Sequence, residues 1–209
     1  MVLTYRQWLR TRELIHEGRI GDLRLVTGVF SYFDTTPNAI HNHVESGGGG
    51  LLDIGCYMTL AARFAFGEMP KRVVSTIDRD PQTKVDRLTS GLMDFTRGQA
   101  SFTCSTQMAH YQRVHFFGTK GHIEIEIPFN APPDRPTRIF IDTVGDLSGK
   151  SIVIEEFPTE DQYTVQGEAF SLAILENTEV PVPLEQAIGN MAVIDAIFRS
   201  AESGRWEKP

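Results

Sequence analysis

The sequence predicts an α+β fold, in which a mostly antiparallel open sheet is covered by helices on one face. Helical patterns occupy both ends of the chain, whereas the middle consists of short runs rich in Val, Thr, Ser and Phe that turn residues separate. Runs of strands flanked by helices are typical of this fold class. Strands that alternate singly with helices, as a doubly wound nucleotide-binding domain requires, are not present. We therefore expect a single domain over residues 1–209 and no Rossmann domain in this chain.

The first third of the chain is predicted to contain two helices and one strand. Apolar residues at helical spacing indicate a helix over residues 4–17, and apolar residues on both parities indicate a strand over Asp22–Phe33. Residues 34–46 are polar and turn-rich, and they lead into four glycines, Gly47–Gly50. A second helix is expected over Leu51–Phe66, since glycine and proline follow it directly.

The remainder is predicted to be a series of short strands closed by two helices. Alternating apolar and polar residues, clearest at His122–Ile127, indicate half-buried strands. The strands are expected at Arg72–Asp78, Asp86–Phe95, Gln99–Met108, Arg113–Phe117, His122–Ile127, Arg138–Asp142 and Ser151–Phe157. The helices are expected at Gln162–Glu176 and Leu184–Ser203.

Composition excludes several classes of protein. The 209 residues are 41% apolar and 22% charged, as in ordinary globular proteins. A net charge of -7 with scattered Lys and Arg argues against binding to nucleic acid. The longest apolar stretch, Leu51–Phe66, is too short to span a bilayer and contains Asp53 and Arg63. Only two cysteines, Cys56 and Cys104, are present, which favours a reducing compartment. We expect a cytoplasmic protein with neither nucleic acid nor membrane as a partner.

The most informative local feature is the glycine run together with Asp53 and Tyr57. These two residues are four apart, so they share one face of a helix that begins beside the glycines. A carboxylate beside a phenol can hold hydroxyl groups and move a proton. The residues alone leave a structural interpretation open, with the glycines as a loop, Asp53 interacting with the helix dipole and Tyr57 in the core.

Other site motifs are not supported. In a dinucleotide fingerprint that began with Gly47 and Gly49, the third glycine would be at position 52, where the sequence has Leu52. Neither a phosphate-binding loop motif nor a serine nucleophile motif occurs in the sequence. His41, His43 and Glu45 alternate and could face one way. No further ligand lies at a characteristic spacing, and a polar loop explains them equally well, so we expect no metal.

Several segments, above all Phe30–Phe33 and the glycine run with Leu51–Tyr57, resemble the C-terminal domain of the Gfo/Idh/MocA oxidoreductase family. The resemblance covers nearly the whole chain and is closest to the branch of xylose dehydrogenases, dihydrodiol dehydrogenases and glucose–fructose oxidoreductase. The matching segments are Phe30–Phe33, the glycine run with Leu51–Tyr57, Ala62–Arg63, Phe66–Gly67, Ile77–Asp80, Tyr111–Gln112, Phe117–Gly121, Ile123–Asn130 and Phe198–Gly204.

The resemblance implies roles for particular residues. Tyr57 would be the proton donor or acceptor at the substrate carbonyl or hydroxyl, and Asp53 would orient the sugar. His41 stands where relatives often carry arginine, and His41 and Asn42 are predicted to contact substrate. The family's catalytic lysine belongs to a Glu-Lys-Pro motif of its N-terminal Rossmann domain, which binds NAD or NADP. Glu207–Pro209 spells the same motif at the end of this chain, where we expect a solvated tail instead.

The functional expectation is therefore the substrate-binding half of an NAD(P)-dependent sugar or dihydrodiol oxidoreductase. We expect it to bind no nicotinamide and to be inactive by itself. It would be a fragment, a truncated gene product, or one half of a split enzyme that acts with a separate Rossmann-domain chain. The alternative is a non-enzymatic carbohydrate-binding or dimerisation module. Because Phe, Ile and Val occur on both parities of the strands, we also expect a homo-oligomer that forms through the free face of the sheet.

Overall fold

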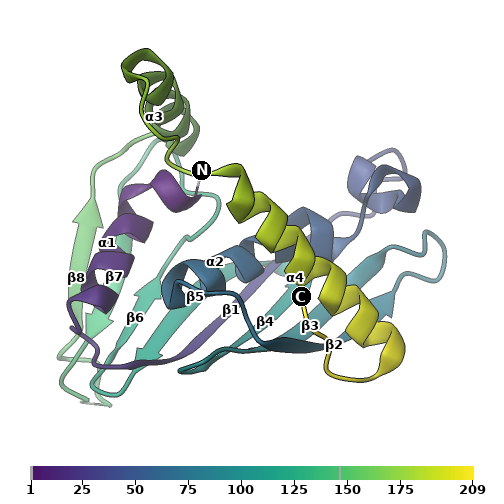
Figure 1. Cartoon of the computed structure of the whole chain (residues 1–209), viewed down its shortest axis with the longest axis horizontal. Helices are drawn as coiled ribbons and strands as arrows, with labels where there is room; N and C mark the ends of the chain where they lie inside the picture. The colour runs from purple at the N-terminus through teal and green to yellow at the C-terminus, as the bar shows by residue number, and fades with distance from the viewer. Residues whose placement is uncertain (1, 146) are drawn as a thin grey trace. The chain divides into compact units, whose positions relative to one another are not determined.

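The computed structural model describes residues 2–145 and 147–209 and shows an open eight-stranded sheet with four α-helices (Figure 1). The strand order is β2-β3-β4-β1-β5-β6-β7-β8. The α-helices are α1 (Arg6–His16), α2 (Cys56–Phe66), α3 (Gln162–Glu176) and α4 (Leu184–Ser203). The strands are β1 (Leu23–Phe33), β2 (Arg72–Arg79), β3 (Asp86–Asp94), β4 (Gln99–Ser105), β5 (Gln107–Gly118), β6 (His122–Ile125), β7 (Thr137–Asp142) and β8 (Val153–Phe157). The predicted α+β class with a mostly antiparallel open sheet is confirmed.

Several predicted boundaries differ from the structure, and the largest differences lie around Thr106. The strand expected over Gln99–Met108 ends at Ser105, and β5 begins at Gln107 instead of Arg113. Thr106, between the two strands, is buried; its N–H donates to the Arg87 carbonyl at 3.2 Å and its carbonyl accepts the Asp34 N–H at 3.0 Å. These hydrogen bonds connect positions distant in sequence, so strand periodicity alone does not reveal where the chain changes strand.

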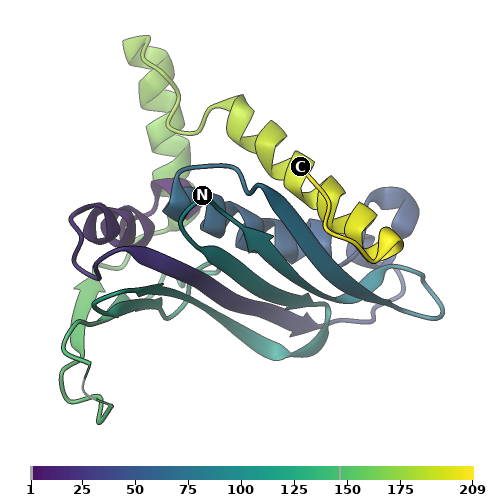
Figure 2. The same ribbon diagram turned by 60° about the horizontal axis from the view of Figure 1, so that its bottom comes forward.

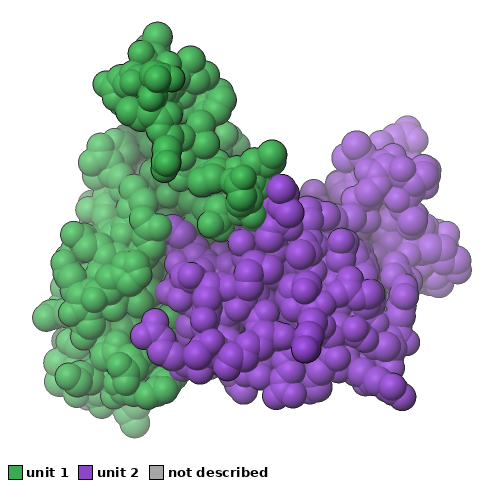
Figure 3. All heavy atoms as spheres, viewed as in Figure 1, with its two compact units in different colours: residues 1–24, 113–187 green, residues 25–112, 188–209 purple. Residues whose placement is uncertain are grey.

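The chain forms two compact units, coloured separately in Figure 3. Unit 2, residues 25–112 and 188–209, contains β2, β3, β4 and most of β1. Strand β1 runs parallel to β4, with Val26 opposite Ala100, whereas β2, β3 and β4 are antiparallel. The side chains buried between this part of the sheet and its helices include Val26, Phe30, Met58, Ala61, Val73, Phe102, Val193, Ile194 and Ile197.

Helices α2 and α4 pack together over this part of the sheet (Figure 2). The Asn190 amide on α4 donates to the Cys56 carbonyl at 3.0 Å, at the start of α2. The Ser75 hydroxyl on β2 donates to the Ile197 carbonyl of α4 at 2.6 Å. These bonds give the polar groups at the helix–sheet contact defined partners, so the helix that carries the predicted site has a fixed register on the sheet.

Unit 1, residues 1–24 and 113–187, has its core around Trp8 of α1. The fully buried indole packs edge-on to Phe116 at 6.1 Å and against Phe129 at 5.9 Å, between ring centroids. Its Nε1 donates to the Pro128 carbonyl at 2.7 Å, so the polar atom of this large aromatic residue is satisfied. In the same unit, α3 buries only Gln162 and Ala173. Its exposed apolar side chains are Tyr163, Phe170, Leu172, Ile174 and Leu175.

The C-terminal tail is held to the sheet, contrary to the expectation of a loose, solvated end. Glu207 pairs with Val73 of β2 through two backbone hydrogen bonds of 2.8 and 2.9 Å, and Arg199 donates to the Lys208 carbonyl at 2.6 Å. The Lys208 side chain is exposed. The tail therefore extends the edge of the sheet. Within residues 2–145 and 147–209, no helix has the length and apolar character needed to cross a bilayer.

Candidate functional site

The helix that carries Asp53 and Tyr57 does not begin as an α-helix. Residues Leu51–Gly55 form a π-helical turn that continues directly into α2. The sequence predicted one α-helix over both segments. Over five residues the side-chain pattern of a π-helical turn is close to that of an α-helix, so the sequence does not distinguish the two forms. A π-helical turn within an α-helix is uncommon and is often found at functional sites. Asp53 lies in this turn and Tyr57 lies one turn later, in α2.

The two side chains differ in exposure. Asp53 is exposed, whereas Tyr57 is half-buried and packs against Phe30 of β1, with 6.0 Å between ring centroids. The carboxylate is therefore not enclosed in the apolar core. It can accept a hydrogen bond from a ligand, and the phenol four residues later lies partly accessible on the same stretch of helix.

Tyr32 was not predicted as a site residue, yet it makes the closest polar contact to Asp53. Its hydroxyl donates to Asp53 Oδ2 at 2.5 Å. Burial, the hydrogen bond to the Asp53 carboxylate and the charge of Asp34 together raise the pKa of Tyr32 well above its usual range. The phenol is therefore a hydrogen-bond donor throughout the physiological range. The sequence placed Tyr32 near the end of a strand, but a pairing 21 residues away in sequence carries no local signal.

Two histidines pack around the Tyr32 ring. The His41 ring lies edge-on at 5.4 Å, and the His110 ring lies at 6.5 Å with a 30° tilt. His41 also approaches Asp34, with 3.3 Å between Nε2 and Oδ2. Hydrogen bonds from Thr36, and then the proximity of His41, lower the pKa of Asp34. The structure thus brings the predicted residue His41 next to Tyr32 and Asp53, and it adds His110 from β5.

Asn42 has a different environment from its neighbour His41. It is buried, and its amide nitrogen donates to the carbonyls of Asp34 at 3.3 Å and Thr36 at 3.0 Å. These bonds hold the loop that follows β1. The amide nitrogen of Asn42 is thus engaged by the backbone. The contact of Asn42 with substrate stays a prediction.

The glycine run packs against protein atoms. A Cβ at Gly48 would lie 2.6 Å from the His41 carbonyl oxygen, and a Cβ at Gly49, where φ is +115°, would overlap Asp86 Oδ1. Asp86 is 1% exposed and accepts the Leu51 N–H at 2.6 Å and the Thr89 hydroxyl at 3.1 Å. Burial raises the pKa of Asp86, and these hydrogen bonds oppose that increase. Two of the four glycines are therefore required by close packing within the chain.

This packing does not fit a dinucleotide. A helix N-terminus binds a phosphate through free N–H groups and a positive dipole end. Here the Leu51 N–H is bonded to the carboxylate of Asp86, which would also repel a diphosphate. The glycine run is therefore not a cradle for the phosphates of NAD or NADP.

The histidines of the loop contact different partners. His41 approaches Asp34, whereas His43 Nε2 contacts the Pro37 carbonyl at 2.8 Å and His43 Nδ1 lies 3.3 Å from Glu45. Among residues 2–145 and 147–209, no three His, Cys, Asp or Glu side chains are grouped so that they could hold a metal ion.

The thiol nearest the site is not a nucleophile at neutral pH. Cys56 and Cys104 are both free. Burial, and then the charge of Asp53, raise the pKa of the Cys56 thiol to about 11. The thiolate, which is the reactive form of cysteine, is therefore scarce at pH 7.

The fold and these residues define a sheet domain that presents a carboxylate and phenols suited to a polyhydroxyl ligand, and comparison with known proteins identifies the family. Residues 8–124, more than half of the chain, match the model of the GFO/IDH/MocA C-terminal domain. The chain belongs to this family, as the sequence predicted.

Named relatives are oxidoreductases. The chain is 39% identical over 208 residues to an uncharacterized oxidoreductase of Rhizobium meliloti, covering 99% of this chain and 62% of the relative. It is 32% identical over 202 residues to D-xylose 1-dehydrogenase (NADP(+)) 2 of Haloferax volcanii, covering 93% and 58%. The chain thus spans about three fifths of the length of these relatives.

Solved structures share the fold. The aldose-aldose oxidoreductase of Caulobacter crescentus, complexed with glycerol, superimposes with a TM-score of 0.84 at 23% identity. That alignment covers 96% of this chain and 60% of the other. At this identity the likeness supports the architecture and not the substrate.

Proposed function

We propose that this chain is the substrate-binding part of an NAD(P)-dependent oxidoreductase that acts on a sugar-like alcohol or carbonyl. The observation that carries the proposal is the exposed Asp53 carboxylate, held by Tyr32 on the π-helical turn, with Tyr57 one turn further along. Membership of an oxidoreductase family supports the reaction class.

The residues of this chain divide the work at the substrate oxygen atoms. Asp53 accepts hydrogen bonds from substrate hydroxyls and so fixes the orientation of the sugar. Tyr57 donates a proton to the carbonyl oxygen during reduction, or accepts the hydroxyl proton during oxidation. His41, whose ring packs against Tyr32, is proposed to contact a further substrate hydroxyl.

Hydride transfer requires a nicotinamide, which we propose is held by a separate nucleotide-binding domain. The glycine run supports this division because Asp86 occupies the helix N-terminus there. The exposed apolar side chains of α3, such as Phe170 and Ile174, are a surface on which such a domain could pack. We place this chain in the cytoplasm, as its cysteine usage predicts.

The decisive experiment is reconstitution of turnover. The part of the Rhizobium meliloti relative that this chain does not match is expressed separately and mixed with the chain, D-xylose and NADP. Turnover that depends on both parts and is abolished by Tyr57→Phe is the expected result, with Thr96→Val, which removes an exposed hydroxyl from a loop, as the control.

Two outcomes would contradict the proposal. Tight binding of NADPH by the chain alone, followed through nicotinamide fluorescence, would show that a cofactor site exists within it. Sugar binding that no nucleotide-binding part affects, with no turnover in any mixture, would favour the non-enzymatic carbohydrate-binding module.

We also propose that the chain self-associates through the face of the sheet opposite α2 and α4. In unit 2 this face has a hollow of about 390 Å³. Apolar side chains, including Val29, Val74 and Leu92, line it together with side chains that carry hydroxyl groups. The hydroxyl groups on this face belong to Thr27, Thr76, Ser90, Ser101 and Thr103, whereas the Ser75 hydroxyl points to α4 on the covered face.

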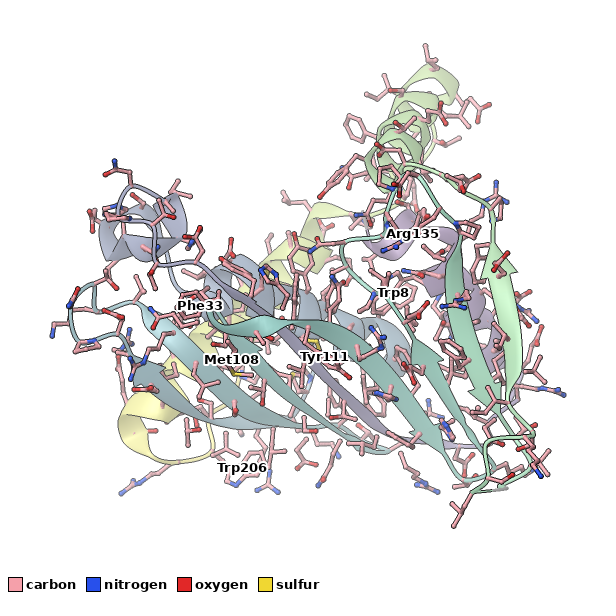
Figure 4. All side chains as sticks on the ribbon, turned by 180° about the vertical axis from the view of Figure 1, so that it is seen from behind. Trp8, Phe33, Met108, Tyr111, Arg135 and Trp206 are labelled. Carbon is pink, nitrogen blue, oxygen red and sulfur yellow. The ribbon has the colours of Figure 1, made fainter. Side chains whose placement is uncertain are left out.

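Exposed apolar side chains add to this proposed interface. Phe33 on β1 and Tyr111 on β5, both in unit 2, are exposed and are labelled in Figure 4. These side chains lie on strands that form the hollow or neighbour it, so apolar and hydroxyl groups share one face of the sheet. We propose that a second copy of the chain covers this face, since a two-fold interface presents the same combination of groups on both sides.

A further inference from the structure

Tyr32 is attached to Asp53 by a hydrogen bond between two different elements, and the resemblance assigned it no role. The phenol comes from β1 and the carboxylate from the π-helical turn, and the 2.5 Å distance is that of a charge-assisted bond. Asp53 is exposed, so an unrestrained carboxylate at this position would sample several rotamers. The bond to Tyr32 selects one of them.

The two carboxylate oxygens of Asp53 have different environments. Oδ2 accepts the Tyr32 hydroxyl, whereas Oδ1 has no hydrogen-bond partner among residues 2–145 and 147–209. An ionised carboxylate has lone pairs on both oxygens. Oδ1 is thus the atom that can accept a hydrogen bond from a ligand.

The Tyr32 ring is itself held in place. His41 packs edge-on to it and His110 lies over it at a shallow tilt, while its half-buried position leaves little space for another rotamer. The neighbouring charged and titratable groups are Asp53 on the helix, Asp34 after β1, His41 in the loop and His110 on β5. The donor is therefore rigid relative to the acceptor that it orients.

We propose that Tyr32 is a positioning residue of the substrate site: by binding Asp53 Oδ2, it aims Oδ1 at a hydroxyl group of a polyol or sugar. This inference rests on the proposed function, because it assumes that Asp53 receives the substrate. It adds a residue on β1 to a site otherwise built on the helix and on the loop that carries His41, and it predicts that Tyr32 acts only through Asp53.

A double-mutant cycle tests this dependence. D-xylose binding to the purified chain is measured by NMR titration for wild type, Tyr32→Phe, Asp53→Asn and the double variant, with Tyr163→Phe as the control. Loss of a hydrogen bond to a charged group should weaken binding about tenfold in Tyr32→Phe. The same substitution in the Asp53→Asn background should have little further effect, because its partner is already altered. Circular dichroism confirms that each variant is folded.

A second readout does not depend on any sugar. The alkaline titration of tyrosine absorbance at 295 nm, taken as the difference between wild type and Tyr32→Phe, isolates the ionisation of Tyr32 among the five tyrosines. Since the hydrogen bond to Asp53 raises the pKa of Tyr32, Asp53→Asn should lower that pKa. A general structural role for Tyr32 would not make its ionisation depend on Asp53.

The outcomes distinguish the two proposals. An unchanged Tyr32 titration in Asp53→Asn, or equal weakening of sugar binding by Tyr32→Phe in both backgrounds, would overturn the positioning role while leaving the proposed function intact. If wild type and Asp53→Asn bind the sugar equally, or neither binds it, the proposed function fails, and with it the positioning role, even where the titration shows that the hydrogen bond exists.

Discussion

The glycine run offers a sharp test of why the site has its shape. In Gly49→Ala the new methyl group would overlap Asp86 Oδ1, and the backbone angle φ of +115° is one that residues with a side chain rarely adopt. The backbone strain costs about 1–3 kcal/mol. Forcing a methyl group into a packed site costs about another 1–3 kcal/mol. We expect a loss of about 2–6 kcal/mol in the free energy of unfolding.

Gly47→Ala is the matched control. Gly47 lies two residues earlier with φ at +73°, and a Cβ there would meet nothing within 4 Å. The only cost of this substitution is that alanine must adopt the left-handed backbone conformation, which lowers the free energy of unfolding by about 1–2 kcal/mol. The two variants therefore separate the cost of crowding Asp86 from the general cost of replacing a glycine in this run.

Urea unfolding followed by circular dichroism measures both losses, and hydrogen exchange of the Leu51 amide reports locally on the bond to Asp86. In an Asp86→Ala background the overlap is gone, so Gly49→Ala should become less costly there. If Gly49→Ala destabilises the chain no more than Gly47→Ala does, the close approach to Asp86 is not what requires glycine, and the reasoning is refuted.

Three further predictions follow from the structure. The pKa of Asp86 is raised in the folded state, so its contribution to stability is present at acidic pH, below the pKa of the unfolded chain, and is lost as pH rises through the folded pKa. The stability of Asp86→Asn relative to wild type should therefore increase between pH 3 and 8 in urea titrations. A constant difference would argue against a raised pKa. Leu92→Arg, at the hydroxyl-lined hollow, should shift a dimer to monomer in light scattering, while Thr96→Arg on an exposed loop should not; a wild-type chain that is monomeric at micromolar concentration would end this proposal. Alkylation of Cys56 by iodoacetamide should be slow at pH 7 and accelerate towards pH 11, as measured by mass spectrometry, whereas fast labelling at pH 7 would show that the thiol is not shielded by burial.

The arrangement of elements was largely contained in the sequence. Alternation along His122–Ile125 and the helical spacing that ends at Phe66 reflect local burial patterns, which each segment carries by itself. The turn at Thr106 was missed because its partners, Asp34 and Arg87, are distant along the chain. The π-helical form of Leu51–Gly55 was missed because its side-chain pattern is close to that of an α-helix.

The sequence by itself determined the fold class, the family and the spacing of Asp53 and Tyr57, because these depend on residue order and on periodicity. Only the tertiary structure decided that Tyr32 reaches Asp53 from another strand, and that the glycines close onto Asp86 instead of onto a phosphate. Hydrogen bonds and close approaches between distant segments depend on distances that the folded backbone sets, and no local pattern of residues encodes those distances.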